Sequence, residues 1–287
     1  MNGIEGDESP AGWELEFDEP FDGDHLDRAH WLPYHLPQWS NRRAAAARYA
    51  VGGGELRLHV DPHQPPWCPE FDGQVQVSSL QTGVFSGPVG STVGQHRFNA
   101  DAEVREFQAT RLLYAPRFAR IEARMRAVAD PHHMVAFWMI GVEDEPAHSA
   151  EICIAEIFGR DVSPATGDAP GSAAVGMGVH PFADPSITDD FDTIELGGDA
   201  TAFHTYTADW SQDSIIFSID GRPVKRVGQS PQYRMQLMLG IYRFPLDHDH
   251  DGEEFAEQLV HTPAPDSHPP EFVVDYVRGY RRTTGTS

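Results

Sequence analysis

Two glutamates stand in an otherwise apolar run of the chain, residues 150–161, which reads AEICIAEIFGRD. The three isoleucines of this run are β-branched, so the run predicts a strand. An unpaired buried carboxylate is costly, and packing alone is a poor reason to place two of them here. Glu151 and Glu156 therefore indicate a pair of groups that share general acid–base work.

The spacing of the two glutamates requires an irregular strand. Side chains alternate along a strand, so Glu151 and Cys153 share a face, whereas Glu156 would point to the other face. A β-bulge near Ile154 or Ala155 adds one residue and returns Glu156 to the face of Glu151. The two carboxyls could then approach to about 5–5.5 Å, the separation that a retaining glycosidase uses.

This stretch resembles the active-site strand of glycoside hydrolase family 16, the laminarinase and lichenase clan, whose bulged motif is Glu-x-Asp-x-x-Glu. The chain keeps both glutamates and has Cys153 in place of the central Asp. Other segments similar to family motifs follow in family order through residues 13–282. They include DEPFDG at 18–23, MVAFWMIG at 134–141, FHTYTADW at 203–210 and FVVDYVRGY at 272–280.

The resemblance implies an all-β fold, a jelly-roll β-sandwich of two antiparallel sheets with a concave substrate cleft. Residues 13–282 would form a single catalytic domain, between a flexible N-terminal segment at 1–12 and a tail at 283–287. The 26 glycines and 23 prolines of the chain agree with the many turns that such a fold needs.

Apolar and polar residues alternate most clearly over Phe118–Val128, which predicts a strand. The RAAAAR segment at 43–48 favours a helix by propensity, but a Gly-rich turn and an alternating strand at Glu55–Val60 follow at once. Asp220-Gly221 between two apolar runs predicts a hairpin. The acidic loop Asp247–His268 contains a short predicted helix at Glu253–Val260.

The resemblance also implies roles for the acid strand. Glu151 would be the nucleophile and Glu156 the general acid–base of a retaining double displacement. In the family the central Asp hydrogen-bonds the nucleophile. Cys153 is a weak donor with an ordinary pKa near 8.5, so reduced activity or a shifted pH dependence is expected. The alternative is a weakened or inactive glycan-binding protein on the same fold.

Several other residues are candidates for sugar binding. Trp138 is expected to line the cleft, because the apolar face of a sugar ring stacks on an indole; a place in the sheet core is the alternative. Trp39 and Trp67 stand on loops expected to rim the cleft. His180 could hydrogen-bond a sugar hydroxyl or serve structure alone, and Asn41 could contact a distal sugar by family analogy.

No cofactor is expected for catalysis, but members of this family often hold a structural calcium ion. The matching positions are carbonyls near Pro20 and Gly54 and the carboxylate of Asp275, which together would make a hard-oxygen site. The acidic, His-bearing stretch Leu246–Glu254 departs from EF-hand spacing and predicts a solvated loop.

Composition limits the partners of the chain. Its 287 residues include 21 basic and 44 acidic residues, a formal net charge of −23, which argues against nucleic acid or an anionic membrane. A neutral polysaccharide or oligosaccharide fits, with β-1,3-glucan or a related β-glucan as the first expectation and a monomer as the acting form. Agarases and carrageenases share the bulged motif, and transglycosylases share the mechanism.

The N-terminus, MNGIEGDESP, has neither the basic region nor the apolar core of a signal peptide. No apolar run is long enough to span a bilayer. The sequence therefore predicts a cytoplasmic protein, and secretion is the alternative that the family suggests. Two cysteines, Cys68 and Cys153, predict no disulfide framework.

Overall fold

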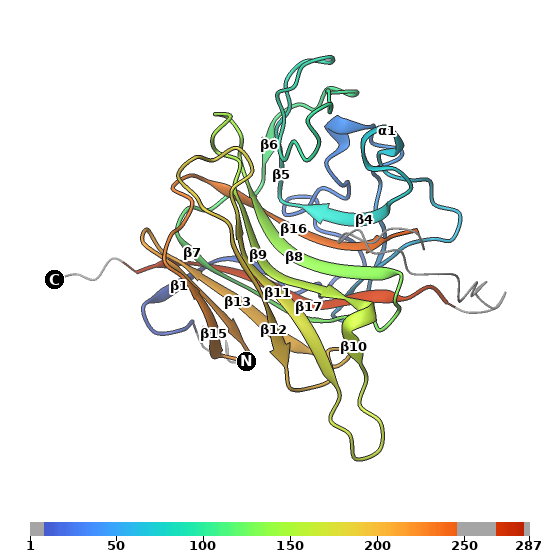
Figure 1. Ribbon diagram of the computed structural model, residues 1–287, viewed down its shortest axis with the longest axis vertical. Coiled ribbons are helices and arrows are strands. Elements are labelled where there is room, and N and C mark those ends of the chain that lie inside the picture. Colours follow the sequence, from blue (N-terminus) through green and yellow to red (C-terminus); the bar gives the residue numbers. More distant parts are fainter. Residues whose placement is uncertain (1–8, 246–267, 284–287) are drawn as a thin grey trace, which may run out of the picture.

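Two large antiparallel sheets make up most of the fold, as seen in a computed structural model that describes residues 9–245 and 268–283 (Figure 1). The first sheet has eight strands in the order β15-β14-β13-β7-β17-β3-β2, with β1 also paired to β17. Its strands are β1 (Trp13–Glu19), β2 (Arg48–Val51), β3 (Leu56–His59), β7 (Ala119–Arg126), β13 (His204–Trp210), β14 (Ile215–Ile219), β15 (Arg222–Val227) and β17 (Glu271–Arg282).

The second sheet has seven strands in the order β10-β11-β9-β8-β16-β4, with β12 also paired to β11. Its strands are β4 (Gln76–Gln81), β8 (His133–Gly141), β9 (Glu151–Phe158), β10 (Val162–Ser163), β11 (Ser172–His180), β12 (Asp190–Leu196) and β16 (Met235–Arg243). The remaining elements are short: β5 (Gly83–Val84) paired with β6 (Arg111–Leu112), the helix α1 (Pro69–Asp72), and the 3₁₀ turns η1 (Pro37–Trp39) and η2 (Gly159–Asp161). The predicted all-β sandwich is confirmed.

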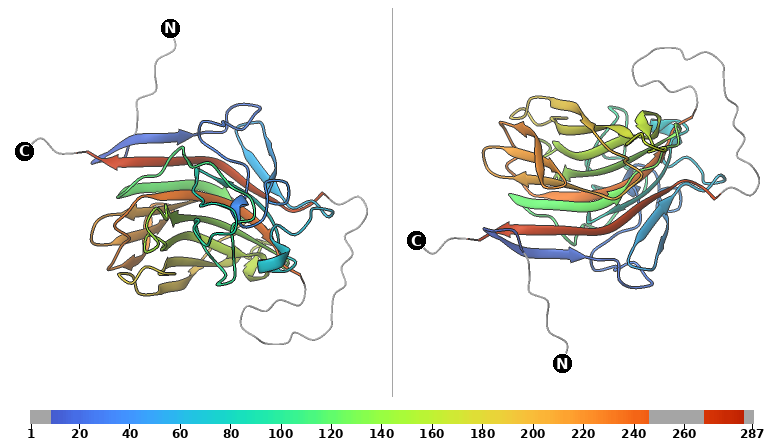
Figure 2. Two further views of the ribbon diagram at one scale, coloured as in Figure 1. Left: turned by 90° about the horizontal axis from the view of Figure 1, so that it is seen from above. Right: turned by 90° about the horizontal axis from the view of Figure 1, so that it is seen from below.

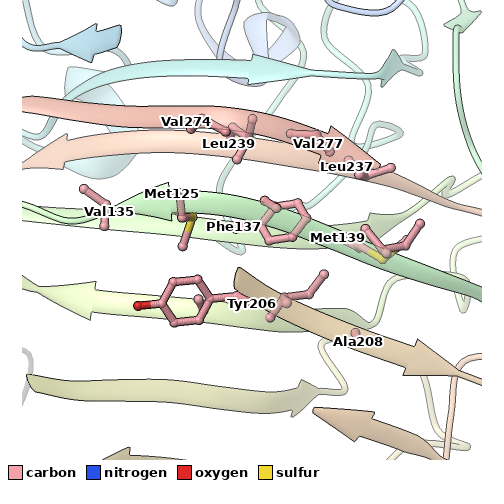
Figure 3. Packing of buried hydrophobic residues seen from close by; sticks show 14 of the residues in the cluster. Met125, Val135, Phe137, Met139, Tyr206, Ala208, Leu237, Leu239, Val274 and Val277 are labelled. Atoms are coloured by element: carbon pink, nitrogen blue, oxygen red, sulfur yellow. The ribbon is translucent and has the colours of Figure 1, made fainter. Parts of the chain in front are cut away.

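The main core fills the space between the two sheets, which Figure 2 shows as layers seen from above and below. Alternation along the strands supplies it: Val135, Phe137 and Met139 of β8 point inward and meet Met125 of β7 and Tyr206 of β13 (Figure 3). Burying apolar area at this interface, worth about 25 cal/mol per Å², drives the assembly of the sandwich. It also fixes which face of each strand is left for the cleft.

A second apolar cluster covers the opposite face of the seven-stranded sheet. Ala136, Trp138 and Ile140 of β8 join residues from the segments that carry η1 and α1, which lie beside β4 and β16 (Figure 1). Every residue of β8 is therefore buried, because the strand has packed neighbours on both faces. This explains why its sequence is a continuous apolar run instead of an alternating one.

Most predicted strands are present with small shifts in their ends. Phe118–Val128 contains β7, and the hairpin around Asp220-Gly221 is β14–β15. The segment at 43–48 is turn and strand, since β2 starts at Arg48. The sequence patterns did not predict β12 or α1, and the helix predicted at 253–260 lies outside the described residues. Within the described part of the chain, no helix has the length and apolar character needed to cross a membrane.

Candidate active site

The site is built on a bulge in β9. Phe137 and Trp138 are consecutive on β8 but pair with Ala155 and Cys153 on β9, so Ile154 is an extra residue without a direct partner. The pairing of β9 with β11 shifts over the same stretch. The bulge predicted near Ile154 is confirmed.

The bulge lets one strand serve two faces. Ile154 and Ala155 are adjacent in the chain, yet both are fully buried in the core between the sheets. Glu151 and Glu156 then both line a pocket on the opposite face. In a regular strand, an odd separation of five residues would have placed one of these glutamates in the apolar core.

The pocket that receives both carboxyls has a volume of about 210 Å³. Its floor comes from β8, β9 and β16, and its walls come from the loops that precede η1, surround α1 and follow β5. The lining residues are His35, Leu36, Trp67, Asp72, Val75, His96, Phe98, Met134, Ala136, Trp138, Glu151, Glu156, Tyr242 and Phe244. Carboxyls and aromatic rings therefore share one small enclosure.

Burial and mutual repulsion set the protonation of the two glutamates. Burial raises the pKa of Glu151 well above its ordinary value, and the nearby charge of Glu156 raises it further. Burial also raises the pKa of Glu156, while His180 opposes this rise. Among the described residues, no hydrogen bond reaches either carboxyl and no lysine or arginine lines the pocket. The pair therefore favours one shared proton, which leaves one acid and one base.

Cys153 lies between the two glutamates and is 1% exposed. Burial raises the pKa of its thiol well above the ordinary value, and Glu156 and Glu151 raise it further. The residue is a free neutral thiol. It can give Glu151 at most a weak hydrogen bond.

Two of the expected aromatic residues do line the pocket. Trp138 is beside the carboxyls on the β8 floor, and Trp67 is on the wall. The Trp67 indole N–H donates to Asp72 Oδ2 at 2.5 Å, which fixes the orientation of the ring. The Trp67 ring is therefore oriented before any ligand arrives.

Three other candidates lie outside the pocket lining. Trp39 is fully buried in the loop cluster, where its Nε1 donates to the Gln95 carbonyl at 2.8 Å, so the expectation that it rims the cleft is wrong. Asn41 is exposed, and its Oδ1 accepts from the Ala44 N–H at 2.9 Å, closing a turn. His180 pairs with Glu151 in the strand ladder, but its Nδ1 is 2.7 Å from an Asp189 oxygen.

Several lining residues were not predicted from the sequence. Tyr242 shares a face of β16 with Met238, so alternation along the predicted strand could have found it. His35, His96 and Phe98 come from loops whose position depends on contacts far away in the sequence, and no local pattern marks them.

The calcium site expected at Pro20, Gly54 and Asp275 does not fit the side chains present. The Asp275 carboxylate is paired with the Arg124 guanidinium at 2.5 Å, and that guanidinium lies 4.5 Å from the centre of the Phe203 ring. A fixed positive charge on the only carboxylate of the expected set removes the attraction for a cation.

One group of three in the described part of the chain has atoms close enough to hold a metal ion. It consists of Glu19, Asp27 and His30, whose ligand atoms lie within 4.8 Å of one another. His30 Nδ1 is 3.2 Å from Glu19 Oε2, and Glu19 Oε1 also accepts the Phe21 N–H at 3.1 Å. These hydrogen bonds account for the group without a metal.

A curved sheet that brings two buried carboxyls together with indole rings in one pocket is typical of proteins that act on carbohydrates. The profile of the family described as "Glycosyl hydrolases family 16" matches residues 95–253, more than half of the chain. The chain belongs to this family.

Solved structures share the fold. The GlcNAcα1-4Gal-releasing endo-β-galactosidase from Clostridium perfringens matches with a TM-score of 0.77 at 24% identity, covering 99% of this chain and 66% of that chain. Laminarinase from Flavobacterium sp. UMI-01 matches with a TM-score of 0.60 at 18% identity, covering 93% of this chain and 100% of that chain. Laminarinase from Rhodothermus marinus matches with a TM-score of 0.58 at 20% identity, covering 94% of this chain and 98% of that chain. No curated protein sequence matches the chain.

Proposed function

We propose that the chain is a retaining glycosidase that cleaves internal β-glycosidic bonds of a neutral glycan. The observation that carries this proposal is the bulge at Ile154, which brings Glu151 and Glu156 into one pocket. Two carboxyls that share a proton can divide the work of nucleophile and acid. Family membership supports the same class of reaction.

In the proposed mechanism, Glu156 holds the shared proton once the glycan is bound, although burial raises the pKa of Glu151 more strongly in the free protein. Ionised Glu151 then attacks the anomeric carbon and forms a glycosyl ester. Protonated Glu156 gives its proton to the leaving glycosidic oxygen as the C–O bond breaks. Glu156, now a carboxylate, then takes a proton from water, and the water oxygen displaces Glu151 from the anomeric carbon. The configuration of the sugar is retained, and both glutamates return to their starting states.

The charge of the pocket supports a neutral substrate. Its described lining contains three carboxyl groups, from Asp72, Glu151 and Glu156, and no lysine or arginine. Burial lowers the pKa of His35 to about 3 and that of His96 to about 4, so neither imidazole carries charge near neutral pH. A sulfated or carboxylated sugar would meet repulsion with no compensating cation.

Two neutral substrates are in competition. A β-1,3-glucan or related β-glucan is the first candidate, as in the laminarinases that share the fold. A β-galactoside is the second, because the structural match to an endo-β-galactosidase has the higher TM-score. A glycan-binding protein without turnover is the third outcome, motivated by Cys153.

The first experiment separates these outcomes. The purified protein is incubated with laminarin, lichenan, xyloglucan, agarose and a glycan ending in GlcNAcα1-4Gal, and reducing ends are counted. Glu151→Gln should lower any cleavage on the order of 10⁴–10⁶-fold, as loss of a hydrolase nucleophile does elsewhere. Glu145→Gln, an exposed change on the loop after β8, is the matched control. Full turnover by the Glu151 variant would refute the proposed mechanism.

The roles of the two glutamates can be distinguished with azide. With an activated aryl glycoside, Glu156→Ala and azide should give a glycosyl azide of retained configuration, because the ester on Glu151 still forms. Glu151→Ala and azide should give the inverted product, because azide then replaces the nucleophile. If Glu156→Ala gave the inverted azide and Glu151→Ala the retained one, the roles of nucleophile and acid–base would be exchanged.

A further inference from the structure

The imidazole of His35 has a buried polar atom without a hydrogen bond. The residue is 4% exposed, and its Nδ1 has no partner among the described residues. Buried polar atoms are nearly always paired in folded proteins, and leaving one unpaired is destabilising. His35 lines the pocket that holds Glu151 and Glu156, so a ligand there could supply the missing partner.

The surroundings of His35 hold its ring in place. The His35 backbone N–H donates to the Ala45 carbonyl at 2.9 Å, and the imidazole ring meets the Trp67 ring edge-on with centroids 4.5 Å apart. The Tyr242 ring also lies edge-on to the His35 ring, with centroids 5.4 Å apart. The next residue, Leu36, has a φ of 41°, a conformation that a leucine rarely adopts and that is typical of functional sites.

We propose that His35 is a sugar-recognition residue, whose imidazole hydrogen-bonds a hydroxyl of the neutral sugar ring that occupies the pocket beside Trp138. This inference rests on the proposed function and names one group that selects its substrate. A neutral imidazole offers one donor and one acceptor, which matches a hydroxyl that can give and accept. The aromatic rings around it match the apolar face of the same sugar.

His96 completes the recognition from the loop after β5. Its Nδ1 also lacks a partner among the described residues, and its ring centroid is 5.1 Å from that of Trp138. The residue has a φ of 51°. Its backbone N–H donates to the buried carboxyl of Glu143, and the neighbouring Gln95 is hydrogen-bonded to Gln236 of β16 at 2.5 Å. The loop is thereby tied to the sheet, with the imidazole in the pocket wall.

The size of the pocket limits what the two imidazoles can read. Its volume of about 210 Å³ is below the roughly 300–1,000 Å³ of pockets for drug-sized ligands. The pocket therefore holds only a short stretch of the glycan, and the rest of the glycan chain must extend beyond it. His35 and His96 would contact the hydroxyls of that short stretch.

Binding measurements on an inactive background test the proposal. Glu151→Gln protein is titrated by calorimetry with laminaritetraose, cellotetraose, neoagarotetraose and the disaccharide GlcNAcα1-4Gal. His35→Phe keeps a ring against Trp67 and removes both nitrogens. It should weaken the best of these ligands about 10–100-fold, as loss of a buried hydrogen bond does. His35→Asn, which restores a polar atom near the Nδ1 position, should recover part of the loss.

Thermal stability separates recognition from structure. Because His35→Phe removes an unpaired buried polar atom, its melting temperature in the absence of sugar should stay equal or rise. The control is His204→Phe on β13 of the other sheet, where the imidazole is bonded to Asp220 at 2.7 Å. It should lower the melting temperature and leave sugar affinity unchanged.

The outcomes for His35 and for catalysis are independent. Unchanged affinity in His35→Phe, or binding of none of the four sugars, would overturn the recognition role even if the wild type cleaves a polymer. Sugar binding that depends on His35 in a protein without any turnover would overturn the proposed hydrolysis and leave the recognition role standing. A lower melting temperature with unchanged affinity would mark His35 as structural only.

Discussion

Phe137 and Trp138 are neighbours on β8, but they face two different environments. Phe137 is fully buried between the sheets among residues that are almost all apolar (Figure 3). Trp138 faces the pocket, where carboxyls and imidazoles lie among the aromatic rings. The inner face is packed almost entirely with apolar side chains, whereas the pocket face keeps unpaired nitrogens on His35 and His96.

The difference shows how one strand can serve stability and chemistry at once. On the inner face, tight apolar packing makes any loss of volume costly. On the outer face, polar groups remain without partners, and such groups are tolerated where a ligand satisfies them. Substitutions on the two faces should therefore change different observables.

The largest contrast is expected between Phe137→Ala and Trp138→Ala. Phe137→Ala should lower the free energy of unfolding by about 3–5 kcal/mol and leave kcat/KM per folded molecule unchanged at low temperature. Trp138→Ala should lower stability less, because the pocket already gives one side of the ring an open neighbour. It should lower kcat/KM roughly fivefold or more, because an aromatic–sugar contact contributes about 1 kcal/mol.

Denaturant titration and initial rates on the same preparations check this pair. The contrast would fail if Phe137→Ala reduced kcat/KM while fully folded, or if Trp138→Ala changed stability alone. Either result would mean that the two faces of β8 are not separable, and that packing across the strand controls the site.

A smaller contrast concerns pH and the loop that carries His96. Glu143 is 9% exposed, and burial raises its pKa to about 8 from 4.5. The folded protein thus holds this proton more tightly than the unfolded chain does. The stability that it contributes is complete below about pH 4.5 and is lost as the pH rises toward 8.

Glu143→Gln keeps an oxygen that can accept the His96 N–H and removes the ionisation. Its free energy of unfolding should therefore fall less than that of the wild type between pH 5 and pH 8.5. Glu145→Gln, which changes an exposed glutamate two residues further on, should follow the wild type. Parallel curves for Glu143→Gln and the wild type would contradict a buried, neutral Glu143.

The sequence predicted the inner face better than the outer one. Inward residues repeat with the strand period, so β7 and the bulge at Ile154 follow from apolar spacing and from the odd separation of two acids. The acids themselves gave the position of the site. β12 was missed because its sequence, DFDTIEL, mixes exposed acids with Phe191 and Ile194, which are only partly buried.

The walls of the pocket could not be predicted because they form by contacts between distant segments. His35 is placed by Ala45, and Leu36 beside it by the side chain of Gln81. The position of Trp39 was predicted wrongly for the same reason. A loop tryptophan was expected at the rim of the cleft, but this one packs under its loop. Asp275 likewise depends on Arg124, whose guanidinium reaches it from the neighbouring strand β7.

A last contrast concerns Cys153, where this chain departs from the family motif. Turnover requires ionised Glu151. Because the pKa of that carboxyl is raised, activity should be lost with falling pH at a higher pH than an ordinary glutamate would give. In Cys153→Asp, the introduced carboxyl, when protonated, would donate a hydrogen bond to Glu151 and lower the pKa of Glu151.

The rate of Cys153→Asp at neutral pH should rise roughly tenfold for one pKa unit, and the acid limb of the pH–rate profile should move to lower pH. Cys153→Ser has a better hydrogen-bond donor than a thiol but no acid, so its rate should lie between those of the wild type and Cys153→Asp. Cys68→Ser, in the loop cluster away from the carboxyls, should leave the profile unchanged. A Cys153→Asp protein with no gain in rate and an unmoved acid limb would mean that burial alone governs Glu151, and that this pocket works without the hydrogen bond.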